Sequence, residues 1–137
     1  MASFTAGECY SFAPKGEVPI KWADGKEWIK LQNTCDVSGS LDDMSLGWGG
    51  GSYSRGHLDI SGSIAAGACM VVGADGDVAA SFSPNLQNAG SVADGIALFD
   101  IRSSDVTAST VPHDAVIYGG ANEDGYHFSG VNWKRDA

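Results

Sequence analysis

Short runs of alternating apolar and polar residues, each closed by turn residues, form the main pattern of this chain. In residues 26–32 (KEWIKLQ), Ile29 and Leu31 alternate with more polar positions, which is the two-residue period of a half-buried strand. Residues 17–22 (EVPIKW) have the same period, and an Asp-Gly pair separates the two runs. Because Asp-Gly is a strong hairpin signal, we expect an antiparallel pair here.

Further strand-like runs follow at intervals of about 8 to 12 residues, a spacing typical of sandwiches and barrels. Helical periodicity is almost absent along the chain. The sequence therefore predicts an all-β protein, a single antiparallel β-sandwich or distorted barrel of about seven to nine short strands, with residues 1–137 as one domain. The runs are residues 68–72, expected to be buried on both faces, 78–82 after an Asp75-Gly76 hairpin turn, 91–99, 115–118 and 126–133.

Two stretches interrupt this pattern. The triple Gly49-Gly50-Gly51 predicts a mobile loop or a backbone that passes close to another group. A loop in the glycine-rich stretch LGWGGGSY (46–53) would present the ring of Trp48 to solvent, where Trp48 and Tyr53 would stack on a sugar in a lectin-like site. Residues 100–114 are too long for a simple hairpin between two strands. They predict a surface loop of the kind that carries binding residues on a rigid scaffold.

The charge balance narrows the classes of partner. Seventeen acidic against eight basic residues give a net charge of −9, which disfavours binding to nucleic acids and to anionic lipid surfaces. No apolar run approaches the length of about 20 residues that a membrane helix needs. We therefore expect a protein partner, self-association or a cation, without nucleic acid or membrane.

The three cysteines, Cys9, Cys35 and Cys69, are widely spaced and form no CxxC pair. This pattern predicts reduced thiols, with Cys69 buried in the apolar run AGACMVV. The first residues lack a basic region followed by an apolar segment, so we expect a cytoplasmic protein.

Carboxylates at the ends of predicted strands are the most numerous polar feature. Clustered Asp side chains on turns are suitable ligands for calcium, and the candidate ligands are Asp94, Asp100, Asp114 and Asp124. The alternative is that these residues form turns, which Asp favours. No nucleophile elbow or phosphate-binding loop occurs, and the three histidines are far apart in sequence, so we expect no enzyme activity.

Several segments resemble, in order, the TerD-type tellurium-resistance and stress-response domains. They are PKGEVPI at 14–20, LGW at 46–48, HLDIS at 57–61 and DAVIYGGANEDGYHFSG at 114–130. That family is a calcium-binding β-sandwich, so the resemblance implies the same fold and ligand. The family's DxD pair reads Leu58-Asp59-Ile60 here; an alternative alignment on residues 91–100 makes Asp94 and Asp100 the acids.

Two function hypotheses follow from these observations. The first is a non-enzymatic cytosolic binding module of TerD-like type that holds calcium through acidic loops at the strand ends. The second is a structural protein that assembles with copies of itself through exposed strand edges and glycine-rich loops.

Overall fold

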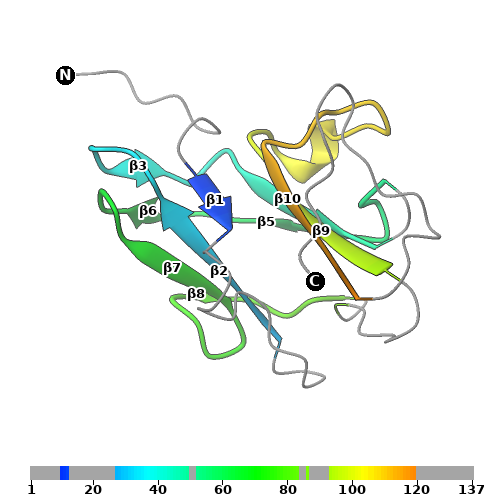
Figure 1. Ribbon diagram of the computed structural model, residues 1–137, viewed down its shortest axis with the longest axis horizontal. Helices are drawn as coiled ribbons and strands as arrows, with labels where there is room; N and C mark the ends of the chain where they lie inside the picture. The colour runs from blue at the N-terminus through cyan, green and yellow to red at the C-terminus, as the bar shows by residue number, and fades with distance from the viewer. Residues whose placement is uncertain (1–9, 13–26, 50–51, 84–85, 87–92, 120–137) are drawn as a thin grey trace.

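The computed structural model describes residues 10–12, 27–49, 52–83, 86 and 93–119, which contain ten strands and one short 3-10 helix. Two four-stranded sheets pack as a sandwich, and a two-stranded sheet adds β3 (Gly39–Ser40) and β6 (Ser63–Ile64) (Figure 1). The predicted all-β class and sandwich are confirmed. Within these residues no helix is long and apolar enough to cross a membrane.

The first sheet has the order β1-β2-β7-β8, with bounds Tyr10–Phe12, Trp28–Asn33, Cys69–Gly73 and Val78–Ala79. Strand β2 confirms the predicted run at 26–32, whereas residues 17–22 and their hairpin lie outside the described residues. Strands β7 and β8 pair in parallel, so the predicted hairpin at 75–76 is wrong. The Gly73 carbonyl accepts the N–H groups of both Gly76 and Ala80, which folds the turn back beside β7.

The second sheet has the order β10-β9-β4-β5 and is antiparallel throughout. Its strands are β10 (Asp114–Gly119), β9 (Ala93–Phe99), β4 (Ser45–Trp48) and β5 (Gly56–Asp59). The runs predicted at 91–99 and 115–118 are thus confirmed as strands. Part of the glycine-rich stretch forms β4 rather than a loop. The connection between β9 and β10 contains the 3-10 helix η1 (Ser103–Asp105).

The main core lies between the two sheets. Ile29 and Leu31 of β2 are completely buried there, which the two-residue period predicts. Trp48 of β4 is 1% exposed and packs edge-on against Phe82, with ring centroids 5.1 Å apart. The expectation that Trp48 is presented to solvent is therefore wrong. Gly56 lies directly under its indole, where a Cβ atom would approach Trp48 Cε2 to 2.4 Å.

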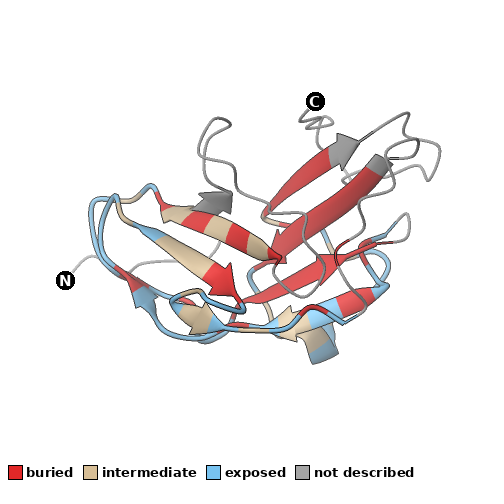
Figure 2. Ribbon diagram, turned by 90° about the horizontal axis from the view of Figure 1, so that it is seen from below, coloured by how far each residue is buried: buried red, intermediate tan, exposed pale blue. Residues whose placement is uncertain are grey.

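Strands β10, β9 and β4 of the second sheet are buried on both faces along their described lengths, whereas the edge strand β5 carries the exposed His57 and Asp59. In β9, Ile96 and Leu98 face the main core, whereas Ala97 and Phe99 join a second apolar cluster with Tyr53, Ala115 and Ile117. Figure 2 shows β9 and β10 buried along their described lengths, while β2 alternates. The run at 68–72 was expected to be buried on both faces, but Cys69 is exposed and Met70 and Val71 are half-buried.

Asn33 connects three segments around the end of β2. Its side chain is fully buried, and Nδ2 donates to the carbonyls of Val37 at 2.9 Å and Ile64 at 3.0 Å. Its Oδ1 accepts the N–H of Cys35 at 2.9 Å. Because a buried amide is favourable only when its hydrogen bonds are made, this residue fixes the turn after β2 against β6.

The cysteines differ from the sequence expectation. Cys35 is disulfide-bonded, so the prediction of three reduced thiols is wrong. Cys69 is free and exposed rather than buried. The period of β7 explains this difference, because Cys69 pairs with Gln32 on the face of the sheet that points away from the main core.

Replacement of Asn33 by Asp tests the importance of its donor group. The Asn33→Asp variant places a carboxylate oxygen against two buried carbonyls, so we expect it to lose about 3 kcal/mol of unfolding free energy at pH 7. Burial raises the pKa of the introduced carboxyl, so the loss should shrink in acid, where its O–H can donate one bond. Denaturant unfolding across pH measures this, with the half-buried Gln32→Glu as control; equal losses in both variants would contradict the role of Asn33.

Candidate functional site

The register of the second sheet brings three chain segments to one end of that sheet. Ser45, which begins β4, pairs with both Asp59 and Phe99, which end β5 and β9. The turn before β4, the end of β5 and the connection 100–113 therefore meet at this end (Figure 1). Five exposed acidic residues lie on these segments: Asp42, Asp43, Asp59, Asp100 and Asp105. We call this group the acidic end.

The connection 100–113 is fastened to the sheet at its start. The Ser45 hydroxyl donates to the Ile101 carbonyl at 2.7 Å. The Asp59 carboxylate accepts the N–H of Ser103 at 2.8 Å, which ties the 3-10 helix to the edge strand β5. One acid of the acidic end thus orders the loop, and the loop carries two of the others.

The tip of the same connection is held by its own hydroxyl groups. Thr110 Oγ1 accepts the N–H of Thr107 at 2.8 Å, and the Thr107 carbonyl accepts the N–H of Thr110. At the far end, the N–H of His113 donates to the Leu98 carbonyl at 2.8 Å. These bonds hold the connection at its tip and at its end, and order of this kind in a free loop lowers the entropic cost of binding.

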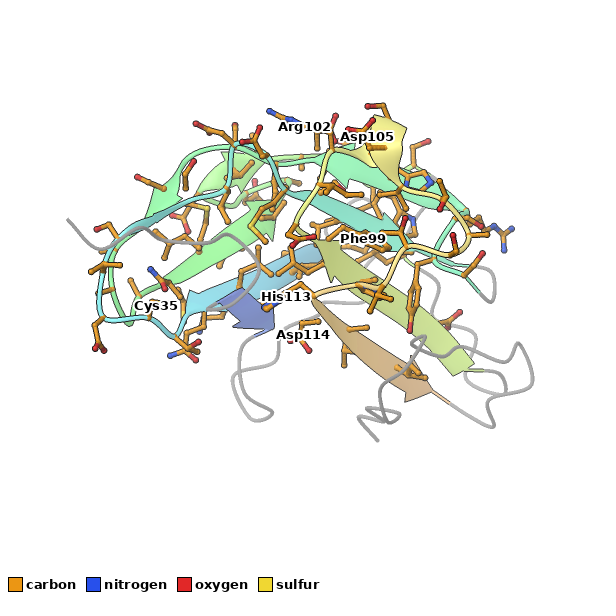
Figure 3. All side chains as sticks on the ribbon, turned by 90° about the horizontal axis from the view of Figure 1, so that it is seen from above. Cys35, Phe99, Arg102, Asp105, His113 and Asp114 are labelled. Atoms are coloured by element: carbon orange, nitrogen blue, oxygen red, sulfur yellow. The ribbon has the colours of Figure 1, made fainter. Side chains whose placement is uncertain are left out.

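Figure 3 shows Arg102 and Asp105 together at the outer edge of this connection, away from Asp114. The backbone hydrogen bond from Ser103 holds the pKa of Asp59 below its ordinary value of 3.8, although burial opposes this shift. The Ser103 hydroxyl and the charges of Arg102 and His57 lower the pKa of Asp59 further. Asp59 is therefore ionised at neutral pH.

Negative charge dominates the described surface. Arg55 is the one exposed Lys or Arg side chain among the described residues. Eight acidic side chains are exposed there: Asp36, Asp75, Asp77 and the five of the acidic end. Because the acids of the acidic end come from separate segments around one sheet, they present a broad, predominantly negative surface rather than a single point charge, with Arg102 as a basic neighbour of Asp59.

The four predicted metal ligands do not all meet. Asp100 and Asp114 lie at the acidic end, because Asp114 pairs with Leu98. Asp94 pairs with Tyr118 at the opposite end of the same hairpin, and Asp124 lies outside the described residues. Asp94 and Asp114 are buried, 3% and 6% exposed. Within the part of the chain that the structure describes, no three His, Cys, Asp or Glu side chains are placed to hold a metal ion.

Of the five acids of this end, the sequence identified Asp100 alone as a candidate ligand, and Asp59 entered only through the TerD-like pattern. Asp42 Oδ1 accepts the N–H of Gly62, at 3.0 Å, so this residue also orders a neighbouring turn. The pairing of β4 with β5 and β9 is the signal that could have found them, because it joins their positions in space.

The other candidate site residues, the histidines and the pair Trp48 and Tyr53, form no site among the described residues. His57 is exposed on β5 and His113 half-buried at the start of β10, while His127 lies outside the described residues. Tyr53, expected with Trp48 to stack on a sugar, is 2% exposed and belongs to the second apolar cluster. Neither ring of that proposed pair is available to a ligand at the surface.

The comparisons with known proteins identify no relative of this chain. Neither a protein-family model, nor a curated protein, nor a solved structure matches the chain.

The lowered pKa of Asp59 gives a pH-dependent prediction. Because folding lowers this pKa, the contribution of Asp59 to stability is complete above pH 3.8 and is lost as the pH falls through the folded-state value. We expect Asp59→Ala to cost less than about 1 kcal/mol at pH 7, since the group is exposed and screened. The difference from wild type should vanish in stronger acid. Thermal unfolding across pH measures it, and Asp105→Ala controls for charge removal from the same loop; a pH-independent difference would refute the assignment.

Proposed function

We propose that this chain is a non-enzymatic binding module that recognises a basic surface of a protein partner through its acidic end. One observation carries the proposal. The strand register gathers five exposed acids at one end of the sandwich, beside a connection that internal hydrogen bonds hold in a defined shape.

The chemistry of the partner follows from the charge of this surface. Exposed carboxylates attract Lys and Arg side chains and speed the encounter with a partner that carries them. Exposed charges contribute little to affinity one by one, so recognition depends on several of them at fixed spacing. The anchoring of η1 against β5 supports such fixed spacing.

A cellular location is proposed with this function. Disulfides persist in oxidising compartments and are rare in the reduced cytosol. The disulfide of Cys35 therefore supports a compartment outside the cytoplasm, and the module would meet its partner there.

Binding to a labelled lysine-rich peptide, measured by fluorescence anisotropy, tests the proposal. We expect saturable binding that weakens as salt rises, because exposed charges are screened, and no binding to a glutamate-rich peptide. Asp100→Asn with Asp105→Asn should weaken binding about fivefold, roughly 1 kcal/mol for two exposed charges.

The control for this experiment removes the same charge elsewhere. The pair Asp36→Asn and Asp75→Asn lies on turns next to β3 and β8, outside the acidic end. It should leave the affinity within twofold of wild type, on the order of 0.4 kcal/mol or less. Equal losses of affinity in the two double variants would show that binding depends on net charge alone, and would refute a defined binding surface.

Calcium binding is the second candidate function. The TerD-like resemblance implies it, and the position of Asp100 and Asp114 at the same end of one hairpin favours it. A ligand that binds only the native state raises the melting temperature. This candidate therefore predicts a rise of several degrees with millimolar calcium, reversed by a chelator and reduced by Asp100→Asn. An unchanged melting temperature with no heat of binding would eliminate it.

A further inference from the structure

We propose that Arg102 is an internal competitor for the acidic end, whose guanidinium takes the place beside Asp59 that a basic side chain of the partner would occupy. This competition rests on the proposed function and regulates the same surface. In the free protein Arg102 weakens binding to basic groups, and a partner binds fully only when its own cations displace that side chain.

The backbone of the connection places Arg102 at the acidic end. Arg102 directly precedes η1, and the N–H of the next residue, Ser103, donates to the Asp59 carboxylate at 2.8 Å. The Arg102 side chain reaches the end of β5 at the outer margin of the molecule (Figure 3), where its Nη1 donates to the Ile60 carbonyl at 3.5 Å. The guanidinium and the carboxylate therefore meet around the two consecutive residues Asp59 and Ile60.

The charge of Arg102 acts on this surface at every physiological pH, because a guanidinium stays protonated. After the hydrogen bonds from Ser103, this charge is a further cause that holds the pKa of Asp59 below 3.8. The acidic end has five negative charges and Arg102 adds one positive charge, so with neutral His57 the formal charge of the group is −4 rather than −5. Displacement of Arg102 by a partner restores the missing negative charge for that partner.

The contact of Arg102 is weak enough to be displaced. The distance of 3.5 Å is at the long limit for a hydrogen bond, and within the described residues the side chain makes this hydrogen bond alone. A guanidinium has five N–H donors, so most of them stay available to water. Charge pairs near the surface are also screened and contribute little one by one.

The connection keeps its shape when this side chain moves, because other groups hold its backbone. The Ser45 hydroxyl fastens the start of the connection, and Asp59 accepts the N–H of Ser103. The Arg102 carbonyl accepts the N–H of Asp105 at 2.9 Å within η1. None of these bonds uses the guanidinium, so the five acids keep their arrangement during the exchange.

A competitor that is part of the chain selects the kind of partner. Arg102 is attached beside Asp59, so its effective concentration there is high at any protein concentration, and one free basic group does not displace it. A partner with several basic side chains engages the other four acids first and then brings a further cation to Asp59 from the bound state. The surface therefore favours a polybasic segment over an isolated cation.

The experiment measures binding of the labelled lysine-rich peptide to the full chain and to three variants by fluorescence anisotropy. Arg102→Gln removes the charge and keeps a polar side chain, so we expect about three- to fivefold tighter binding and a steeper loss of affinity as salt rises. Arg102→Lys keeps the charge and should gain less affinity than Arg102→Gln. Arg55→Gln makes the same change in net charge just before β5, away from the acidic end, and should stay within about twofold of wild type.

A second measurement does not depend on the peptide. In an NMR titration of the Asp59 carboxyl group, the pKa should be higher in Arg102→Gln than in wild type, because the charge that favours the ionised form is gone. The melting temperature of this variant should stay within about 3 °C of wild type, since the substitution is near the surface and leaves the backbone bonds in place.

The outcomes separate this competition from the function on which it rests. If wild type binds the peptide but Arg102→Gln gains no affinity, or if the pKa of Asp59 is unchanged, the competition is overturned and the proposed function stands. An equal gain in Arg55→Gln would show an effect of net charge and would also overturn it. Binding by Arg102→Gln but not by wild type would support complete internal blocking. Absence of binding by every variant would overturn the proposed function, and the competition with it.

Discussion

Strands β10, β9 and β4 are buried on both faces, so the fold must cover the outer face of their sheet as well as its inner one. The floor of that outer face is made of small residues, among them Gly47, Ala97 and Ala115, on which Tyr53 and Phe99 pack. Gly47 has no room for a Cβ, which would lie 2.5 Å from the Tyr53 carbonyl oxygen. Tyr53 itself takes a φ of 57°, which a non-glycine residue adopts at a cost of about 1 kcal/mol or more.

This requirement explains the long connection between β9 and β10. Ile101 and Val106 pack against the second cluster, so the connection first serves as a lid for Phe99. The backbone of the connection also needs hydrogen-bond partners. The Ser45 hydroxyl donates to the Ile101 carbonyl, and the Asp59 carboxylate accepts the N–H of Ser103. The acidic end is therefore a result of how the outer face is covered, and its shape depends on the stability of that second cluster.

The pattern of apolar residues predicted two kinds of strand. One kind has a buried face and a more exposed face, and the other carries a continuous apolar run. Strand β2 alternates clearly, and β9 and β10 are apolar between turn residues, so their positions follow from the sequence. Strand β4 could not be predicted in this way, because Gly47 and Gly49 suggest a loop. Their small size serves close packing instead, against Tyr53 and Arg55.

The candidate site was predictable only in part. Neighbouring strands of an antiparallel sheet run in opposite directions, so the sequence alone does not say which strand ends lie at the same end of the sheet. Asp94 is the second residue of β9 and Asp100 follows its end, so six residue steps of extended chain, about 20 Å, separate them. Adjacent acids in the sequence can thus lie at opposite ends of a strand, while Asp59 and Asp100, far apart in the sequence, lie at the same end of the second sheet.

The glycines packed against other groups have a consequence for sequence variation. A Cβ at Gly56 would enter the Trp48 ring, and one at Gly73 would lie 2.6 Å from the Glu27 carbonyl oxygen. Both positions lie within strands and away from the acidic end, yet natural drift should leave them unchanged. Among descendants of this chain, invariance at these glycines would record steric exclusion, whereas covariation among the exposed acids would record selection by a partner.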